Sequence, residues 1–154
     1  VAPEPQGLQA SRAIDDALRR ADIDPADLCA VQAHATGTSL GDLAEARALR
    51  RSFGSVADSL PVYAPKGQLG HLLGAAGSVE AILGIQALSE GILPQSINAD
   101  PLDPGVDIAV TTSGPVKLQA AQSERYLLKN AFGFGGHNIS LILAAPCSTA
   151  AQHN

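Results

Sequence analysis

The segment from Gly70 to Gly91 is the part of the sequence that most restricts what this chain can fold into. Small residues recur at intervals of four, three, four and three positions, which places them on one stripe of an α-helix where another helix could lie very close. Leucine, isoleucine and valine cover its other faces, so the predicted helix is apolar nearly all round and belongs in the middle of a layered structure. Because a chain of 154 residues would hardly bury such a helix on every side, we expect a further half of the protein or a partner chain to cover it. The stripe consists of Gly70, Gly74, Gly77, Ala81 and Gly84.

Helical and strand patterns alternate along the first two-thirds of the chain, and strands follow one another at the end. A connection rich in proline and aspartate spans 94–105, and a glycine-rich turn at 133–138 separates the last two predicted strands. This order predicts an α/β layered fold with a mostly parallel mixed sheet and a terminal hairpin. The predicted elements are helices at 8–21, 42–52 and 70–91, and strands at 28–33, 61–64, 107–111, 126–132 and 139–144.

Composition argues against several classes of function. The net charge is −5, with no basic run and few aromatic residues, so a nucleic-acid partner is not expected. Polar residues interrupt the longest apolar stretch, so no membrane span is expected, and two cysteines form neither a disulfide framework nor a metal motif. With no signal peptide, a cytoplasmic location is expected. The first residue is Val1 rather than Met, which indicates a fragment: one domain over 1–145 and a frayed tail over 146–154.

His34 ends a predicted buried strand and begins the run His-Ala-Thr-Gly-Thr. Residues at the carboxyl ends of parallel strands face the usual ligand crevice of an α/β sheet. The hydroxyls of Thr36 and Thr38 stand two residues apart and suit a ligand arm that carries amides. The alternative is a loop that caps the next helix.

His71 lies in the first turn of the predicted long helix. The positive end of the helix dipole disfavours an imidazolium there. A neutral imidazole is a good hydrogen-bond donor to an enolate or carbonyl oxygen. The alternative is a histidine that caps a turn.

Three acidic residues accompany these histidines. Glu80 lies on the apolar helix, where a buried carboxylate needs a partner, and Lys66 is the candidate. A solvated Glu80 is the alternative. Asp42 and Glu45 lie one turn apart near a predicted helix start, where we expect them to complement the dipole and anchor the preceding loop.

The third glycine cluster, Gly-Phe-Gly-Gly at 133–136, is not a dinucleotide fingerprint, because its spacing differs and it joins two strands. Three glycines around Phe134 indicate a loop with an aromatic gate whose backbone N–H groups could donate to an oxyanion. A plain hairpin turn is the alternative.

Together these motifs resemble the β-ketoacyl–acyl-carrier-protein synthases, the condensing enzymes of the thiolase fold. The resemblance runs from about Gly7 to Leu143. It rests on His-Ala-Thr-Gly-Thr-x-x-Gly-Asp-x-x-Glu, Lys-x-x-x-Gly-His-Leu-Leu-Gly-Ala-Ala-Gly and Asn-x-Phe-Gly-Phe-Gly-Gly-x-Asn. The run Tyr-Ala-Pro-Lys at 63–66 and His137 look most like the discrete synthases that elongate long acyl chains in fatty-acid biosynthesis.

The resemblance implies roles for the site residues. His34 and His71 would be the catalytic pair that stabilises the enolate formed when a malonyl-carrier protein loses carbon dioxide. Lys66 would support His71 and pair with Glu80. Phe134 would be the gate, and its backbone N–H would contribute to the oxyanion hole. Thr36, Thr38 and Gly135 would contact phosphopantetheine.

The resemblance also implies partners and a limitation. No cofactor or metal is expected, since substrates are carried on the phosphopantetheine of acyl-carrier protein. The partners would be that carrier protein, the N-terminal half of the same enzyme and, in the intact family, a second copy in a homodimer. The nucleophilic cysteine of the family belongs to the missing half, because Cys29 lies in a predicted strand and Cys147 in the tail. We therefore expect this chain alone to be inactive.

Three alternatives remain open at the level of sequence. The chain could be a non-catalytic partner of the chain-length-determining kind, or a fragment of a polyketide-type ketosynthase. It could also be a metal hydrolase that uses His34, His71, Asp42 or His137, although no two of these have ligand spacing on one element.

Overall fold

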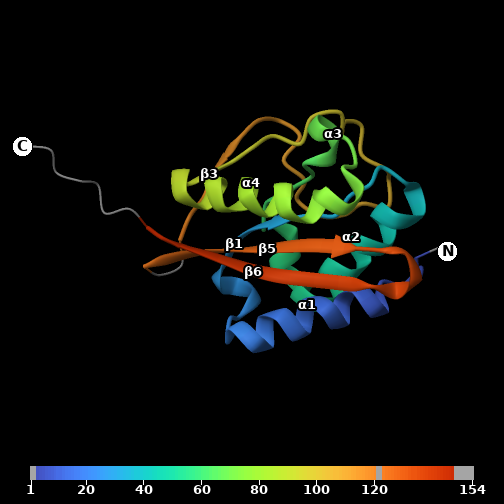
Figure 1. Ribbon diagram of the computed structural model, residues 1–154, viewed down its shortest axis with the longest axis horizontal. Helices are drawn as coiled ribbons and strands as arrows, with labels where there is room; N and C mark the ends of the chain where they lie inside the picture. Colours follow the sequence, from blue (N-terminus) through green and yellow to red (C-terminus); the bar gives the residue numbers. More distant parts are fainter. Residues whose placement is uncertain (1–2, 121–122, 148–154) are drawn as a thin grey trace, which may run out of the picture.

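A four-stranded mixed sheet separates two layers of helix (Figure 1). The computed structural model describes residues 3–120 and 123–147. Strand β1 pairs in parallel with β2 and β5, and β5 pairs with β6 as an antiparallel hairpin, so β2 and β6 form the edges. The predicted mostly parallel sheet with a terminal hairpin is confirmed. The strands are β1 (Leu28–Gln32), β2 (Val62–Tyr63), β5 (Glu124–Phe132) and β6 (Asn138–Pro146).

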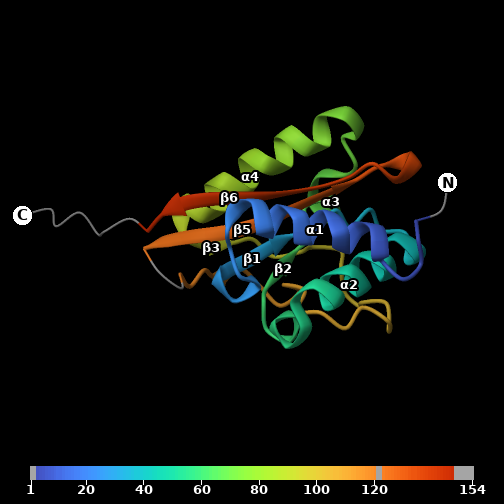
Figure 2. The ribbon, with the colours of Figure 1, turned by 90° about the horizontal axis from the view of Figure 1, so that it is seen from below.

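Helices α1 (Leu8–Ala21) and α2 (Ser39–Phe53) cover one face of the sheet, and α4 (Ala76–Glu90) covers the other (Figure 2). All five residues of β1 are buried, as expected for a strand covered on both sides. Successive residues point to opposite layers. In β5, Leu128 packs into the core with α1 and α2, whereas Leu127 packs with α4.

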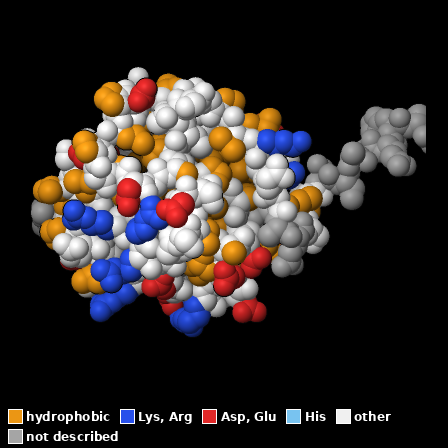
Figure 3. Space-filling view, turned by 180° about the vertical axis from the view of Figure 1, so that it is seen from behind, with side chains coloured by type: hydrophobic (Ala, Val, Ile, Leu, Met, Phe, Trp, Pro, Cys, Tyr) orange, Lys and Arg blue, Asp and Glu red, His pale blue; other side chains and the backbone are white. Residues whose placement is uncertain are grey.

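Helix α1 has the bounds that the sequence predicts. Its apolar stripe, which includes Ile14 and Leu18, is buried, and its other side is charged. There Asp16 pairs with Arg19 and Arg20. Figure 3 shows charged side chains gathered over the lower part of the molecule, where α1 and α2 lie. The bounds of α1 are predictable from the sequence because of this amphipathic pattern.

The prediction of one continuous helix over 70–91 is wrong for its first part. The chain forms α3 (Lys66–Leu69), an irregular link and a 3-10 turn at Leu73–Ala75 before α4 begins at Ala76. Gly70 and Leu73 have φ of 71° and 50°, which a right-handed helix cannot accommodate. No helix in the described part of the chain is long and apolar enough to cross a membrane.

Of the glycines in the predicted small stripe, Gly84 packs on the sheet, whereas a Cβ at Gly70, Gly74 or Gly77 would meet nothing within 4 Å. A Cβ at Gly84 would lie 2.8 Å from Oε1 of Gln32 and 2.9 Å from Cδ1 of Leu143, so glycine lets α4 approach the sheet closely. The outer face of α4 leaves Ile82 57% and Ile85 48% exposed. Burial on every side is therefore not achieved within the described residues.

Several other elements also differ from prediction. Helix α2 begins at Ser39 rather than Asp42, directly after the extended Thr38. The strand expected over 107–111 is reduced to a bridge between Val110 and Val62. A separate two-stranded antiparallel sheet, which was not expected, joins β3 (Ile92–Leu93) and β4 (Val116–Lys117). Its two-residue strands are too short to give a periodic signal.

The predicted tail over 146–154 is only partly described. Pro146 still pairs with Glu124 at the end of β6. Residues 148–154 lie outside the described part, so the predicted fraying there stays untested.

The start of α1 gives a testable contact. Gly7 precedes this helix at φ 70°, and a Cβ there would lie 2.5 Å from the carbonyl oxygen of Ala44 in α2. We expect Gly7→Ala to lower the free energy of unfolding by about 2–4 kcal/mol, because backbone strain adds to the clash. Urea denaturation measures this loss of stability. Gly77→Ala in α4, where a Cβ would meet nothing within 4 Å, should instead be neutral or stabilise by up to about 1 kcal/mol. Equal midpoints for the two variants would contradict the contact.

Candidate active site

Three segments that are far apart in the sequence meet at the carboxyl ends of β1 and β5. The ring centroids of His34 and His71 lie 5.8 Å apart, with an interplanar angle of 88°. The ring of Phe132 lies 5.8 Å from that of His34 at 57°. The structure thus brings together the two histidines that the sequence singles out. Phe132 was missed, although the parallel pairing of β5 with β1 brings its end beside His34.

The loop after β1 is anchored by Glu45, a buried residue of α2. Its two carboxylate oxygens each accept a backbone N–H at 2.8 Å, one from His34 and one from Ala35. The side-chain amide of Asn130 donates to the same carboxylate at 3.0 Å. Burial raises the pKa of Glu45, while these three donors oppose the rise. These hydrogen bonds place Glu45 on the backbone of the loop that the sequence analysis expects it to anchor, and the contact with Asn130 was not expected.

The remainder of this loop offers hydroxyl groups. Asp42 accepts the backbone N–H of Gly37 at 3.3 Å, so it also anchors the loop, and burial raises the pKa of Asp42. The hydroxyl oxygens of Thr36 and Thr38 lie 3.4 Å apart, with Thr38 exposed and Thr36 half-buried. Both threonines follow His34 closely along the chain, and their contact with a ligand stays a prediction.

A buried ionic cluster lies beneath the histidines. Nζ of Lys66 lies 2.6 Å from Oε1 of Glu80, as the sequence predicts, and Nζ of Lys129 lies 3.1 Å from Oε2. The three side chains are at most 5% exposed. The sequence analysis missed Lys129, whose one signal is a charge in the middle of an apolar strand. The cluster joins α3, α4 and β5.

Lys66 contacts His34, whereas the sequence analysis expected it to support His71. Its Nζ donates to the backbone carbonyl of His34 at 2.6 Å and lies 3.4 Å from Nδ1. The reason is topological: Lys66 follows β2, and β2 lies beside β1. Because an ammonium has only protons to offer, Nδ1 accepts and the imidazole proton resides on Nε2.

His34 is held neutral by its surroundings. Burial lowers its pKa most, and electrostatic interactions with Lys66, His71 and Lys129 lower it further, to about 4. At neutral pH the ring therefore carries no charge and can donate one hydrogen bond from Nε2.

His71 lies in the link between α3 and the 3-10 turn, not in the first turn of a helix. The predicted effect of a helix dipole on His71 is therefore wrong, since α4 begins five residues later at Ala76. The backbone N–H of Leu73 donates to Nδ1 of His71 at 3.3 Å. This contact also leaves Nε2 as the proton-bearing atom of a neutral ring. The side chain is exposed.

The glycine loop forms a 3-10 turn over Phe134–Gly136 between β5 and β6. Gly135 has φ 80°, and the N–H of Gly133 donates to the carbonyl of His137 at 2.8 Å. The side chain of Phe134 lies outside the described part, so its role as a gate stays a prediction.

Neither cysteine belongs to this site. Sγ of Cys29 donates to the carbonyl of Tyr126 at 3.1 Å inside the sheet, and burial raises the pKa of Cys29 to about 11. A protonated, buried thiol is a poor nucleophile. Cys147 follows β6, and its backbone N–H donates to Ser123.

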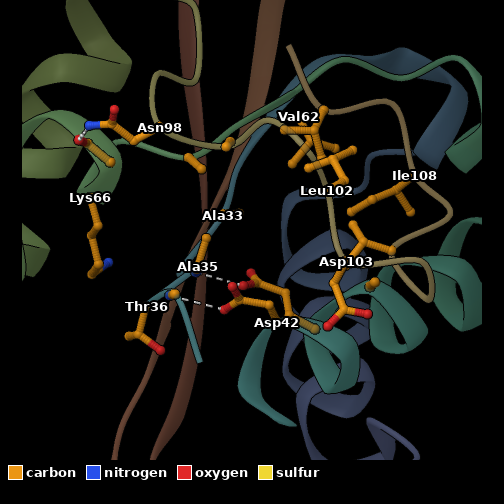
Figure 4. Close-up of a pocket in the computed structure, with 18 of the residues that line it drawn as sticks. Ala33, Ala35, Thr36, Asp42, Val62, Lys66, Asn98, Leu102, Asp103 and Ile108 are labelled. Carbon is orange, nitrogen blue, oxygen red and sulfur yellow. Dashed lines mark hydrogen bonds between the residues drawn. The ribbon is translucent and has the colours of Figure 1, made fainter. Parts of the chain in front are cut away.

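A cavity of about 330 Å³ adjoins the site (Figure 4). Lys66 and Asn98 border one side and Leu102, Asp103 and Ile108 the other. Neither His34 nor His71 is among its lining residues, so the cavity does not enclose the two rings. It adjoins the histidine pair through Lys66, which lines the cavity and also contacts His34.

Comparison with known proteins gives consistent matches. Residues 1–100 match the family model described as "Beta-ketoacyl synthase, C-terminal domain". The chain is 44% identical over 141 residues to a Mycobacterium tuberculosis protein named 3-oxoacyl-[acyl-carrier-protein] synthase 2. The match covers 92% of this chain and 32% of the relative. A protein of the same name from Mycobacterium leprae is 44% identical over 142 residues, with the same coverage. The chain thus spans about a third of the length of these curated relatives.

Solved structures agree with this match. A beta-ketoacyl synthase from Burkholderia phymatum superposes with a TM-score of 0.82 and 31% identity, covering 96% of this chain and 34% of that one. The ishigamide ketosynthase/chain length factor gives 0.83 and 29%, covering 93% and 34%. A type II polyketide ketosynthase in complex with its acyl-carrier protein gives 0.85 and 25%, covering 95% and 35%.

Removal of the central carboxylate tests the ionic cluster. We expect Glu80→Ala to lower the free energy of unfolding by about 3–5 kcal/mol, because it leaves Lys66 and Lys129 buried without a counter-charge. Chemical denaturation measures the loss. Glu90→Ala, at the exposed end of the same helix, should change stability by no more than about 0.5 kcal/mol. Similar losses in both variants would mean that the cluster does not stabilise the fold.

The lowered pKa of His34 predicts acid sensitivity. Between pH 6.5 and about 4 the unfolded chain binds a proton at this residue that the folded chain does not. Stability should therefore fall as the pH falls through this window. The raised carboxyl pKa values of Asp42 and Glu45 have the opposite effect on the pH dependence of stability. A His34→Gln variant retains both carboxyl groups, so their effect is the same in the two chains. The difference in unfolding free energy between the two chains isolates His34, and an identical pH slope in both would refute its lowered pKa.

Proposed function

Because the chain belongs to the β-ketoacyl synthase family, as its C-terminal domain, we propose that it supplies the two histidines of a 3-oxoacyl-acyl-carrier-protein synthase. The reaction is fatty-acid chain elongation by decarboxylative condensation of an acyl thioester with a malonyl thioester. One observation carries the proposal: two imidazoles lie 5.8 Å apart, and each accepts at Nδ1, which leaves each a proton to donate from Nε2.

Two neutral N–H donors suit the charge that develops in this reaction. When the carboxylate of the malonyl group leaves as carbon dioxide, the electron pair of the broken C–C bond delocalises onto the thioester oxygen. His34 and His71 would stabilise that enolate oxygen. A preorganised donor of this kind contributes about a hundred- to a thousandfold in rate. The α-carbon then attacks the acyl thioester carbonyl, a C–C bond forms, and the thiol leaves.

The other residues of the site would hold the donors in place. Glu45 fixes the backbone at His34, and Lys66 fixes both its carbonyl and its tautomer. Glu80 holds Lys66 from α4. This arrangement supports positioning roles for all three, since none of them needs to exchange a proton during decarboxylation.

The carrier-borne substrate would enter along the loop after His34. The hydroxyls of Thr36 and Thr38, 3.4 Å apart, suit the amides of a phosphopantetheine arm, with Gly135 on the opposite loop. The structural neighbour bound to its acyl-carrier protein supports that protein as partner. For the intact enzyme we further propose a homodimer in the cytoplasm, with Phe134 as gate and no bound cofactor or metal.

The nucleophile that carries the acyl group would come from a second segment of protein. Cys29 is a buried, protonated thiol. The exposed apolar side chains of Ile82 and Ile85 offer a face on which the N-terminal half of the enzyme can pack. The length of the relatives, about three times that of this chain, supports the same assignment.

Acyl transfer to the isolated chain tests the nucleophile. Incubation with a radiolabelled acyl thioester should leave no covalent label, because the thiol of Cys29 is protonated and buried. A label on Cys29 would overturn the division of the site between two segments.

Decarboxylation tests the histidines. The chain is combined with the cysteine-bearing N-terminal part of a relative, and carbon dioxide release from malonyl-acyl-carrier protein is measured. His71→Ala should reduce this rate at least a hundredfold, whereas Arg12→Ala on the exposed side of α1 should not change it. Unchanged decarboxylation in His71→Ala would favour a non-catalytic partner of the chain-length-determining kind.

A further inference from the structure

Lys129 is a buried charge for which the reaction described above has no use. It lies in the middle of β5 and is 1% exposed. Burial of an ammonium is costly unless a counter-charge compensates it. Lys66 already pairs with the same carboxylate, that of Glu80, so Lys129 is not needed to neutralise it.

The charges of this cluster do not balance. Two ammonium groups share one carboxylate, Lys66 at 2.6 Å from Oε1 and Lys129 at 3.1 Å from Oε2. Oε2 of Glu80 receives no directed hydrogen bond, so its contact with Lys129 is electrostatic. The cluster therefore carries one positive charge in excess, in a region where little solvent screens it.

This excess charge lies beside an imidazole. Lys66 contacts both the carbonyl and Nδ1 of His34. We propose that Lys129 is a positioning residue for His34: its charge, added to that of Lys66, leaves the cluster positive and so opposes protonation of the imidazole. The proposal rests on the proposed function, in which His34 must stay neutral to donate to the enolate. Its consequence is a lower acid limit for the reaction.

The charged and titratable groups around His34 all contribute to this balance. Burial of the ring is the largest cause of its lowered pKa, followed by Lys66, His71 and Lys129, so the effect of Lys129 adds to an imidazole that is already hard to protonate. Glu45 faces the backbone of His34 and stays the same in every variant below. The groups are Lys66 on α3, His71 in the link after it, Lys129 on β5, Glu80 on α4 and Glu45 on α2.

The experiment is an NMR titration of the His34 ring in the full chain, with its signals assigned from their loss in His34→Gln. Lys129→Met removes the excess charge, so the midpoint should rise from about 4 by roughly half a pH unit or more. Lys129→Arg keeps the charge and should keep the low midpoint. Lys117→Met, on exposed β4, is the matched control and should change nothing.

A double variant separates charge from structure. Lys129→Met combined with Glu80→Gln restores an excess of one positive charge, so the midpoint should return toward its original value. A purely structural role for Lys129 predicts no such return. Should Lys129→Met fail to fold, Glu80→Gln alone, which increases the excess charge, should lower the midpoint. A midpoint that does not move in folded Lys129→Met, or in Glu80→Gln, overturns the proposal.

The titration needs neither substrate nor the second segment of the enzyme. Unchanged decarboxylation in His71→Ala in the reconstituted assay would refute the proposed function and leave the titration unchanged, so the two failures are distinguishable.

Discussion

The buried carboxylate of Glu80 is the interaction on which this arrangement depends. It lies on α4, a helix that otherwise presents small and apolar residues to the sheet, and it binds one ammonium from α3 and one from β5. A hydrophobic contact could join these elements, but it would not fix their relative positions as narrowly as a charge that must be paired in a dry interior. Through Lys66 the carboxylate also fixes the start of the loop after β1. The fold and the site therefore share one electrostatic constraint.

A second constraint comes from the opposite face of the sheet. Glu45 reaches from α2 to the first two N–H groups beyond the buried strand residues, and Asn130 of β5 completes its shell. The residue at the start of the active loop is thus held from below by a carboxylate and from above by an ammonium. Such a double anchor gives a neutral imidazole a fixed orientation without burying it fully, which is what a hydrogen-bond donor to a transient oxyanion requires.

Sequence patterns predict the parts of this structure that depend on local periodicity or on charge in an apolar setting. The bounds of α1 follow from its amphipathic stripe, and the pairing of Lys66 with Glu80 follows from a charge placed on an apolar helix. The break between α3 and α4 could not be predicted, because hydrophobic periodicity continues through Gly70 and Leu73 while their backbone leaves the helical region. Lys129 and Phe132 were missed for another reason. Both lie on β5, and their importance comes from contacts between distant parts of the chain. Lys129 pairs with Glu80 of α4, and Phe132 lies beside His34 because β5 pairs with β1.

The free edge of β6 has a practical consequence. This nine-residue strand ends the sheet, and its exposed Ile139 and Leu141 accompany a row of backbone N–H and carbonyl groups without a neighbouring strand in the described sheet. Natural sheets usually protect such an edge from pairing with another chain by means of charged side chains, proline or a covering loop. A preparation of this chain should therefore become turbid as it is concentrated, and a short edge-capping peptide or a lysine substitution at position 139 or 141 would be the rational remedy in handling it.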